Sequence, residues 1–142
     1  MVAYFALVND AYDRLKKLDE SKVSLKLDDK KWSKKEILGH LCDSCINNYY
    51  RFMHLQQSSK PYKVKKYDQD LWVEVRAYQN QSWSETLNLW YSLNLSLLNV
   101  LDNSLDEHAE HPVIINEETY TYRYLAEDYF DHLQHHLNQI FS

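Results

Sequence analysis

His132 and His136 lie four residues apart near the end of the chain, in a stretch whose apolar residues recur at helical spacing. On a helix, side chains four residues apart lie on one face, so both imidazoles can reach a single metal ion. A third histidine, His40, lies at the edge of the apolar face of another amphipathic stretch, as the pair does on its own. The three rings can therefore converge on one cleft between two helices.

Three neutral imidazole nitrogens form a ligand set for a divalent cation, and we expect Zn²⁺ or Ni²⁺, with Mn²⁺ or Fe²⁺ as alternatives. A site with no fourth protein ligand leaves coordination positions open, which distinguishes catalytic metal sites from closed structural ones. An ion held in this way lowers the pKa of a bound water or thiol, or polarises an electrophile. The spacing alone is a weak signal in a chain with 7 histidines, because exposed histidines at helical spacing often bind nothing.

Three polar residues are candidates for supporting such a site. Asp43 and Asn47 fall on a polar strip beside His40, and Asp128 lies one helical turn before His132. Any of them could orient a ligand imidazole or a metal-bound water. A solvated helix face explains the same residues equally well.

Four amphipathic stretches supply the helices that must position these side chains. Their apolar residues recur at spacings of three and four, which predicts helices over about 2–18, 33–57, from 82 to beyond 101, and from 122 almost to the end. The second and third begin with an S-x-x-E capping box, in which each side chain satisfies a free backbone donor of the other residue: Ser33 with Glu36, and Ser82 with Glu85. The chain is therefore predicted to be all-α, a four-helix bundle.

The connection between the second and third helices predicts their relative direction. It extends over about 58–81, includes a short amphipathic piece around Leu71 and Trp72, and is long enough to travel the length of the bundle. Antiparallel neighbours need only short loops, so we expect these two helices to run the same way, in up-down-down-up order. A small hairpin of 113–115 with 119–120 around Asn116 is also predicted, although no strong turn dipeptide supports it.

The composition limits the classes of protein that the chain can belong to. Its 142 residues favour one domain, 1–142, and the single glycine argues against a sheet protein with many hairpins. A net charge of -5 offers no basic stripe for nucleic acid, and no apolar run is long enough to span a membrane. Asn9 and Asp10 interrupt the stretch in which a signal peptide would stay apolar, so we expect a cytoplasmic protein.

Cys42 and Cys45 have the spacing of a redox or metal-binding C-x-x-C motif. A metal site of that kind would normally need a second pair of ligands nearby. Both cysteines fall on the apolar face of their helix, where a free cysteine behaves as a small hydrophobic residue. We favour that structural interpretation.

Two separated motifs resemble the DinB-like family. Residues 32–44, WSKKEILGHLCDS, are similar to its W-S-x-x-E-I-L-G-H-L-x-D-S pattern, and residues 131–140, DHLQHHLNQI, resemble its H-x-x-H-H-x-x-Q-I ending. Both occur in the family's order, and the resemblance extends over essentially the whole chain. It implies an up-down-down-up four-helix bundle with a metal held by three histidines, which map onto His40, His132 and His136.

We keep two hypotheses about function, and the resemblance informs the first of them. Relatives in this family include transferases that use low-molecular-weight thiols, which implies addition of a thiol co-substrate to a small electrophile, and a metal-dependent hydrolase is the chemical alternative. The second hypothesis is a non-enzymatic module, in which apolar surface beyond the needs of one core joins a homodimer or binds a partner and the metal site is vestigial. We expect a small-molecule substrate and a homodimer, with neither nucleic acid nor membrane as partner.

Overall fold

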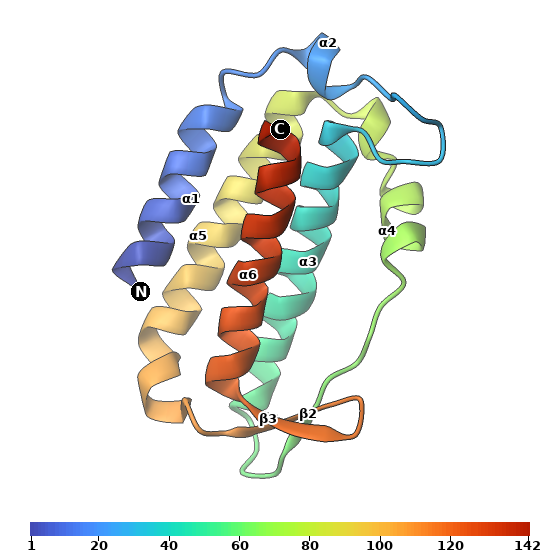
Figure 1. Ribbon diagram of the computed structural model, residues 1–142. Helices are drawn as coiled ribbons and strands as arrows, with labels where there is room; N and C mark the ends of the chain where they lie inside the picture. Colours follow the sequence, from blue (N-terminus) through green and yellow to red (C-terminus); the bar gives the residue numbers. More distant parts are fainter.

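Four long helices lie side by side in the computed structural model, which describes residues 1–142 (Figure 1). They are α1 (Val2–Leu15), α3 (Lys34–Leu55), α5 (Trp83–His108) and α6 (Tyr122–Phe141). Each corresponds to one stretch with helical spacing, although α1 ends earlier than predicted, in a turn that precedes the short helix α2 (Glu20–Val23). The protein is mostly helical, as the sequence predicts.

Both predicted capping boxes are present. At the start of α3, the Ser33 hydroxyl accepts a hydrogen bond from the Glu36 backbone N–H at 3.1 Å, and the Glu36 carboxylate accepts one from the Ser33 N–H at 2.8 Å. Ser82 and Glu85 form the same reciprocal pair at the start of α5. These bonds satisfy backbone donors that the first helical turn leaves free, and they fix where α3 begins.

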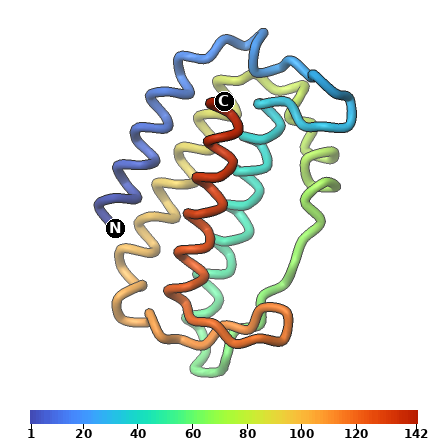
Figure 2. Tube along the Cα trace, viewed as in Figure 1, coloured from blue at the N-terminus to red at the C-terminus, as the bar shows by residue number.

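The connection between α3 and α5 runs along the side of the bundle. Figure 2 shows this segment passing from the sheet end, where α3 finishes, to the opposite end, where α5 begins. In the same view α3 and α5 both run toward the sheet end, and α6 returns to the end at which the C-terminus lies. The connection contains α4 (Gln69–Arg76) and a 3₁₀ helix, η1 (Tyr78–Asn80). It therefore adds a wall beside α3.

A small sheet at one end corrects the all-α prediction. Strands β2 (Pro112–Ile115) and β3 (Glu118–Thr121) form the expected antiparallel hairpin, and β1 (Tyr62–Lys63) pairs in parallel with β2. The turn residues Asn116 and Glu117 have φ values of 50° and 69°, so no glycine is used where the left-handed region is needed. A strand of two residues has no detectable alternation, and its partner is remote in sequence, so β1 could not be predicted.

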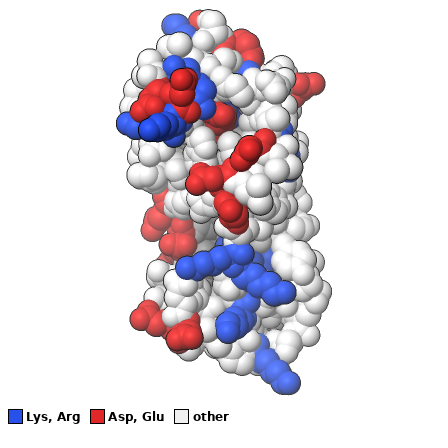
Figure 3. Space-filling model, turned by 90° about the vertical axis from the view of Figure 1, so that its right-hand side faces the viewer, with Lys and Arg blue, Asp and Glu red and all other residues white.

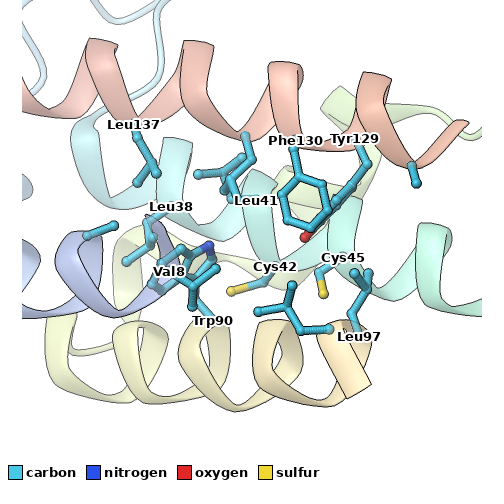
Figure 4. Close-up of a cluster of buried hydrophobic side chains, with 14 of the residues drawn as sticks. Val8, Leu38, Leu41, Cys42, Cys45, Trp90, Leu97, Tyr129, Phe130 and Leu137 are labelled. Atoms are coloured by element: carbon cyan, nitrogen blue, oxygen red, sulfur yellow. The ribbon is translucent and has the colours of Figure 1, made fainter. Parts of the chain in front are cut away.

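The core fills the space between the long helices (Figure 4). Cys42 and Cys45 project from α3 toward α5, where Trp90 and Leu97 lie, and both cysteines are free and fully buried. This placement agrees with the structural interpretation of the C-x-x-C pair. No helix combines the length and the apolar character that crossing a membrane would require.

Candidate metal centre

The three predicted histidines meet where α3 and α6 pack together. One nitrogen from each of His40, His132 and His136 lies within 4.8 Å of the other two. The Nε2 atoms of His40 and His132 are 3.1 Å apart, and the His136 ring lies 4.8 Å from the His40 ring and 4.5 Å from the His132 ring, centroid to centroid. The structure thus brings together residues that are more than 90 positions apart in the sequence.

Burial differs among the three rings and makes the cluster asymmetric. His40 is fully buried, with the Trp32 ring 4.9 Å from its own, whereas His132 and His136 on α6 are half-buried. The deep ring therefore forms the floor of the cluster, and the two α6 rings form its open side. An ion held there would remain accessible from solvent.

Burial also keeps the histidines neutral. Desolvation, with smaller contributions from the neighbouring histidines, lowers the pKa of His40 from 6.5 to about 3 and that of His132 from 6.5 to about 4. The pKa of His136 is lowered as well, mainly by desolvation. Neutral imidazole is the form that binds a metal, so protons do not compete for these nitrogens near neutral pH.

The geometry fits a single small cation. Nitrogen ligands bound at about 2.0–2.1 Å lie roughly 2.9–3.4 Å from each other, which includes the observed distance between His40 and His132. His40 Nδ1 is buried without a hydrogen-bond partner, so the ring's one polar contact is with His132. Two unprotonated nitrogens that face each other repel, and a proton or a cation between them removes that repulsion. The donor set is therefore suited to Zn²⁺ or to a similar divalent ion.

Gln139 orients one ring of the cluster, and the sequence analysis did not identify it. Its Oε1 lies 2.8 Å from His136 Nδ1, so Nδ1 is the nitrogen that carries the proton and Nε2 keeps a free lone pair. Its Nε2 donates to His135 Nε2 at 3.2 Å. Gln139 follows His136 by three residues and so lies on the same face of the helix, and this spacing could have identified it from the sequence.

None of the three predicted supporting residues makes a hydrogen bond with a cluster imidazole. Asp43 is buried and accepts a hydrogen bond from the Tyr78 hydroxyl at 2.6 Å, and Asn47 donates to the Asp43 backbone carbonyl at 2.9 Å. Asp128 is exposed on α6, and partial desolvation of its carboxyl group by neighbouring residues raises the pKa of that group. Their proposed roles stay predictions.

A cleft of about 330 Å³ adjoins the cluster, and His132 forms part of its wall. Residues of α3, of α6, and of the connection as far as Gln69 at the start of α4 enclose it. The lining residues are Ser44, Asn48, Arg51, Lys66, Tyr67, Gln69, Asp128, Tyr129 and His132. The residues from the connection were not predicted, because nothing in their own sequence indicates which helix face they cover.

Acid is expected to destabilise the metal-free protein through the buried rings. The unfolded chain takes up protons at the ordinary histidine pKa of 6.5, while folded His40 stays neutral down to about 3. The unfolded state therefore binds more protons over this range. The free energy of unfolding decreases as the pH is lowered, by up to about 1.4 kcal/mol per pH unit for one such group. Urea unfolding in a chelating buffer between about pH 7.5 and 4.5 measures this slope.

The variant His40→Gln provides the control for that slope. It removes one titrating ring and leaves the carboxylates unchanged, so we expect its stability to fall less steeply over the same range. Equal slopes for the two proteins would contradict the neutral state of His40.

The fold and the cluster define a helical-bundle protein with a candidate three-histidine metal centre. The chain belongs to the DinB superfamily, whose family model matches residues 7–140. The fold is similar to the solved structure of YfiT from Bacillus subtilis, with a TM-score of 0.80, 22% identity, and coverage of 97% of this chain and 82% of that one. YfiT has been described as a probable metal-dependent hydrolase with an unusual four-helix bundle topology. Among the curated proteins, none matches this chain.

Proposed function

We propose that this protein is a metal-dependent enzyme that acts on a small molecule bound in the cleft. His40, His132 and His136 hold one divalent cation, with Zn²⁺ or Ni²⁺ favoured over Mn²⁺ and Fe²⁺. The observation that carries the proposal is the convergence of three neutral imidazole nitrogens within 4.8 Å at the wall of a cleft. The up-down-down-up helix order belongs to the same proposal, and the course of the chain in Figure 1 supports it.

The bound cation would supply Lewis acidity, which stabilises an anionic nucleophile near neutral pH or polarises an electrophile. Residues of the cleft would accept the proton of the nucleophile and position the substrate. Asp128 lies one turn from His132, and its raised carboxyl pKa makes it a better proton acceptor than an ordinary aspartate. Burial raises the pKa of Tyr67 to about 12, so its hydroxyl stays protonated and can donate a hydrogen bond to the substrate.

A thiol co-substrate of low molecular weight is the nucleophile that we propose. The protein's own thiols cannot serve, because Cys42 and Cys45 are fully buried and burial raises the pKa of Cys45 to about 12. In the proposed reaction the thiol proton passes to the Asp128 carboxylate. The thiolate sulfur then forms a bond to an electrophilic carbon, and the leaving group departs with its electron pair.

Hydrolysis is the second candidate, and the description of YfiT favours it. Water takes the place of the thiol, and Asp128 accepts its proton in the same way. An assay of the metal-loaded protein on a panel of small electrophiles and esters, with and without added thiol, separates the two reactions. Substrate-dependent loss of free thiol supports transfer, whereas product release that is independent of thiol supports hydrolysis.

Metal content tests the proposal most directly. Protein purified without a histidine tag is expected to carry about one divalent ion per chain by elemental analysis, and His136→Ala is expected to carry almost none. His54→Ala is the matched control, because His54 lies on the same helix as His40 but outside the cluster. Its metal content should equal that of the wild type.

Wild-type protein with far less than one ion per chain after incubation with each candidate metal would overturn the enzyme proposal. The alternative would then be the non-enzymatic module, a homodimer or partner-binding bundle with a vestigial site. The homodimer and the cytoplasmic location remain predictions, and light scattering of the purified protein measures the first of them.

A further inference from the structure

Arg51 is a half-buried cation that forms no direct ion pair with a carboxylate. Its guanidinium lies on the wall of the cleft, where Nη2 donates to the Lys65 carbonyl at 2.7 Å and Nη1 contacts the Asn48 side-chain oxygen at 3.4 Å. It forms no ion pair within 4.0 Å, whereas other charged groups of the chain do. A guanidinium has five N–H donors, so at least three remain free to bind a ligand.

The charge around the cleft mouth is opposite in sign to that of the whole chain. The net charge is -5, yet the segment 60–66, KPYKVKK, carries four lysines and no acidic residue. None of these lysines forms an ion pair, and Lys66 lines the cleft with Arg51. Figure 3 shows a group of Lys and Arg side chains in the lower half of the face along which this segment runs. An approaching anion is attracted to this mouth.

We propose that the cleft binds the oxyanion end of the substrate, a carboxylate or a phosphate, through Arg51 and Lys66. This inference rests on the proposed function for the other end of the substrate, which reaches the histidine cluster beside His132. The Asp128 carboxylate of the same cleft acts on Arg51 only from beyond ion-pair distance, so the partly dehydrated guanidinium keeps free donors, and a bound oxyanion would give it charge-assisted hydrogen bonds. The flat, forked donor array of arginine fits two oxygens of one group.

The helix geometry sets the size of the molecule. Arg51 follows His40 by eleven residues on α3, which corresponds to about 16 Å along the helix axis. Side chains on a helix lean toward its N-terminus, and this applies to His40 as well as to Arg51, so the guanidinium and the cluster are separated by more than one helical turn. Asp128, on the α6 side of the cleft, disfavours a second negative charge in between. The substrate class is therefore a small molecule with one terminal oxyanion and a reacting atom more than one helical turn, about 5 Å, away.

The test measures anion binding to the metal-free protein at low ionic strength. Butyrate and inorganic phosphate serve as the probes, titrated by calorimetry into the wild type and into single variants. We expect Arg51→Gln to weaken binding of the preferred probe by about tenfold or more, and Lys66→Gln by about threefold. Lys63→Gln is the matched control: it changes the charge equally but lies on β1 outside the cleft, and it should change the affinity less than twofold.

Equal weakening in Arg51→Gln and Lys63→Gln would overturn the proposal, since it would show diffuse attraction to the lysine segment. Absence of binding of both probes to the wild type would overturn it as well. The Lys66 side chain makes no hydrogen bond or ion pair, so Lys66→Gln is expected to fold and keeps the test decisive if Arg51→Gln does not fold. Unchanged affinity in Lys66→Gln would also contradict binding in the cleft. Because no metal is present in this titration, its outcome is independent of the metal content of the wild type, and a wild type that binds no metal would overturn the enzyme proposal separately.

Discussion

Zinc is expected to stabilise the wild-type protein by about 4 kcal/mol when its free concentration exceeds the dissociation constant about 1,000-fold. A ligand that binds the native chain and not the unfolded one shifts the unfolding equilibrium by mass action. The cluster forms only on folding, because its rings come from helices that are remote in sequence. Thermal or urea unfolding with and without Zn²⁺, at a pH near 7.5, measures the stabilisation.

The variant His40→Ala should lose most of this zinc-induced stabilisation. His40 is the buried ligand whose ring contacts both α6 rings, so its removal leaves only a half-buried pair at helical spacing. The truncation also lowers the stability of the metal-free protein, and for this reason the measured quantity is the difference with and without zinc. His54→Ala, on the same helix but outside the cluster, is the control. An equal zinc effect in His40→Ala and in the wild type would contradict a site at these three residues.

Replacing Gly39 with alanine is expected to lower the free energy of unfolding by about 2 kcal/mol, within the usual range for overpacking a core. A Cβ atom at this position would overlap the ring of Tyr78. That ring cannot move aside easily, because it is fully buried and its hydroxyl is hydrogen-bonded to Asp43 at 2.6 Å. In an unobstructed helix interior, replacing glycine with alanine would raise the free energy of unfolding by about 1 kcal/mol. A decrease therefore indicates that the Tyr78 ring occupies the space that the new Cβ atom needs.

A double-mutant cycle isolates the contact. In a Tyr78→Leu background the ring is absent, and Gly39→Ala should become neutral or stabilising in urea unfolding. The same cost in both backgrounds would show that the contact does not limit the residue at 39. The position adjoins His40, so zinc binding by Gly39→Ala also shows whether the packing of η1 against α3 influences the metal centre.

Local signals in the sequence predicted the long helices and two of their starting points. Ser33 with Glu36 and Ser82 with Glu85 act within one turn of helix, so their chemistry does not depend on the rest of the fold. The side-by-side placement of His132 and His136 is equally local, because one helical period determines it. The approach of His40 to this pair was inferred from the edges of two apolar faces, and the structure shows the approach.

Other features depend on which surfaces meet after folding. The single glycine lies within α3, where its lack of a side chain admits the Tyr78 ring, and no local pattern distinguishes this use from a turn. Strand β1 exists only because β2 lies beside it, and the polar residues Lys66 and Tyr67 become cleft residues only because the connection crosses α3 and α6. Asp43 shows the same limit, since no local pattern indicates that its hydrogen-bond partner is Tyr78 of η1.

The sequence by itself therefore determined the helices, the face on which each histidine lies and the membership of a family. Only the tertiary structure decided the depth of His40, the partner of His136 and the wall that turns a helix groove into a cleft. The physical reason is range: capping and periodicity act over a few residues, whereas burial and the pairing of charges depend on segments that fold against each other from distant parts of the chain.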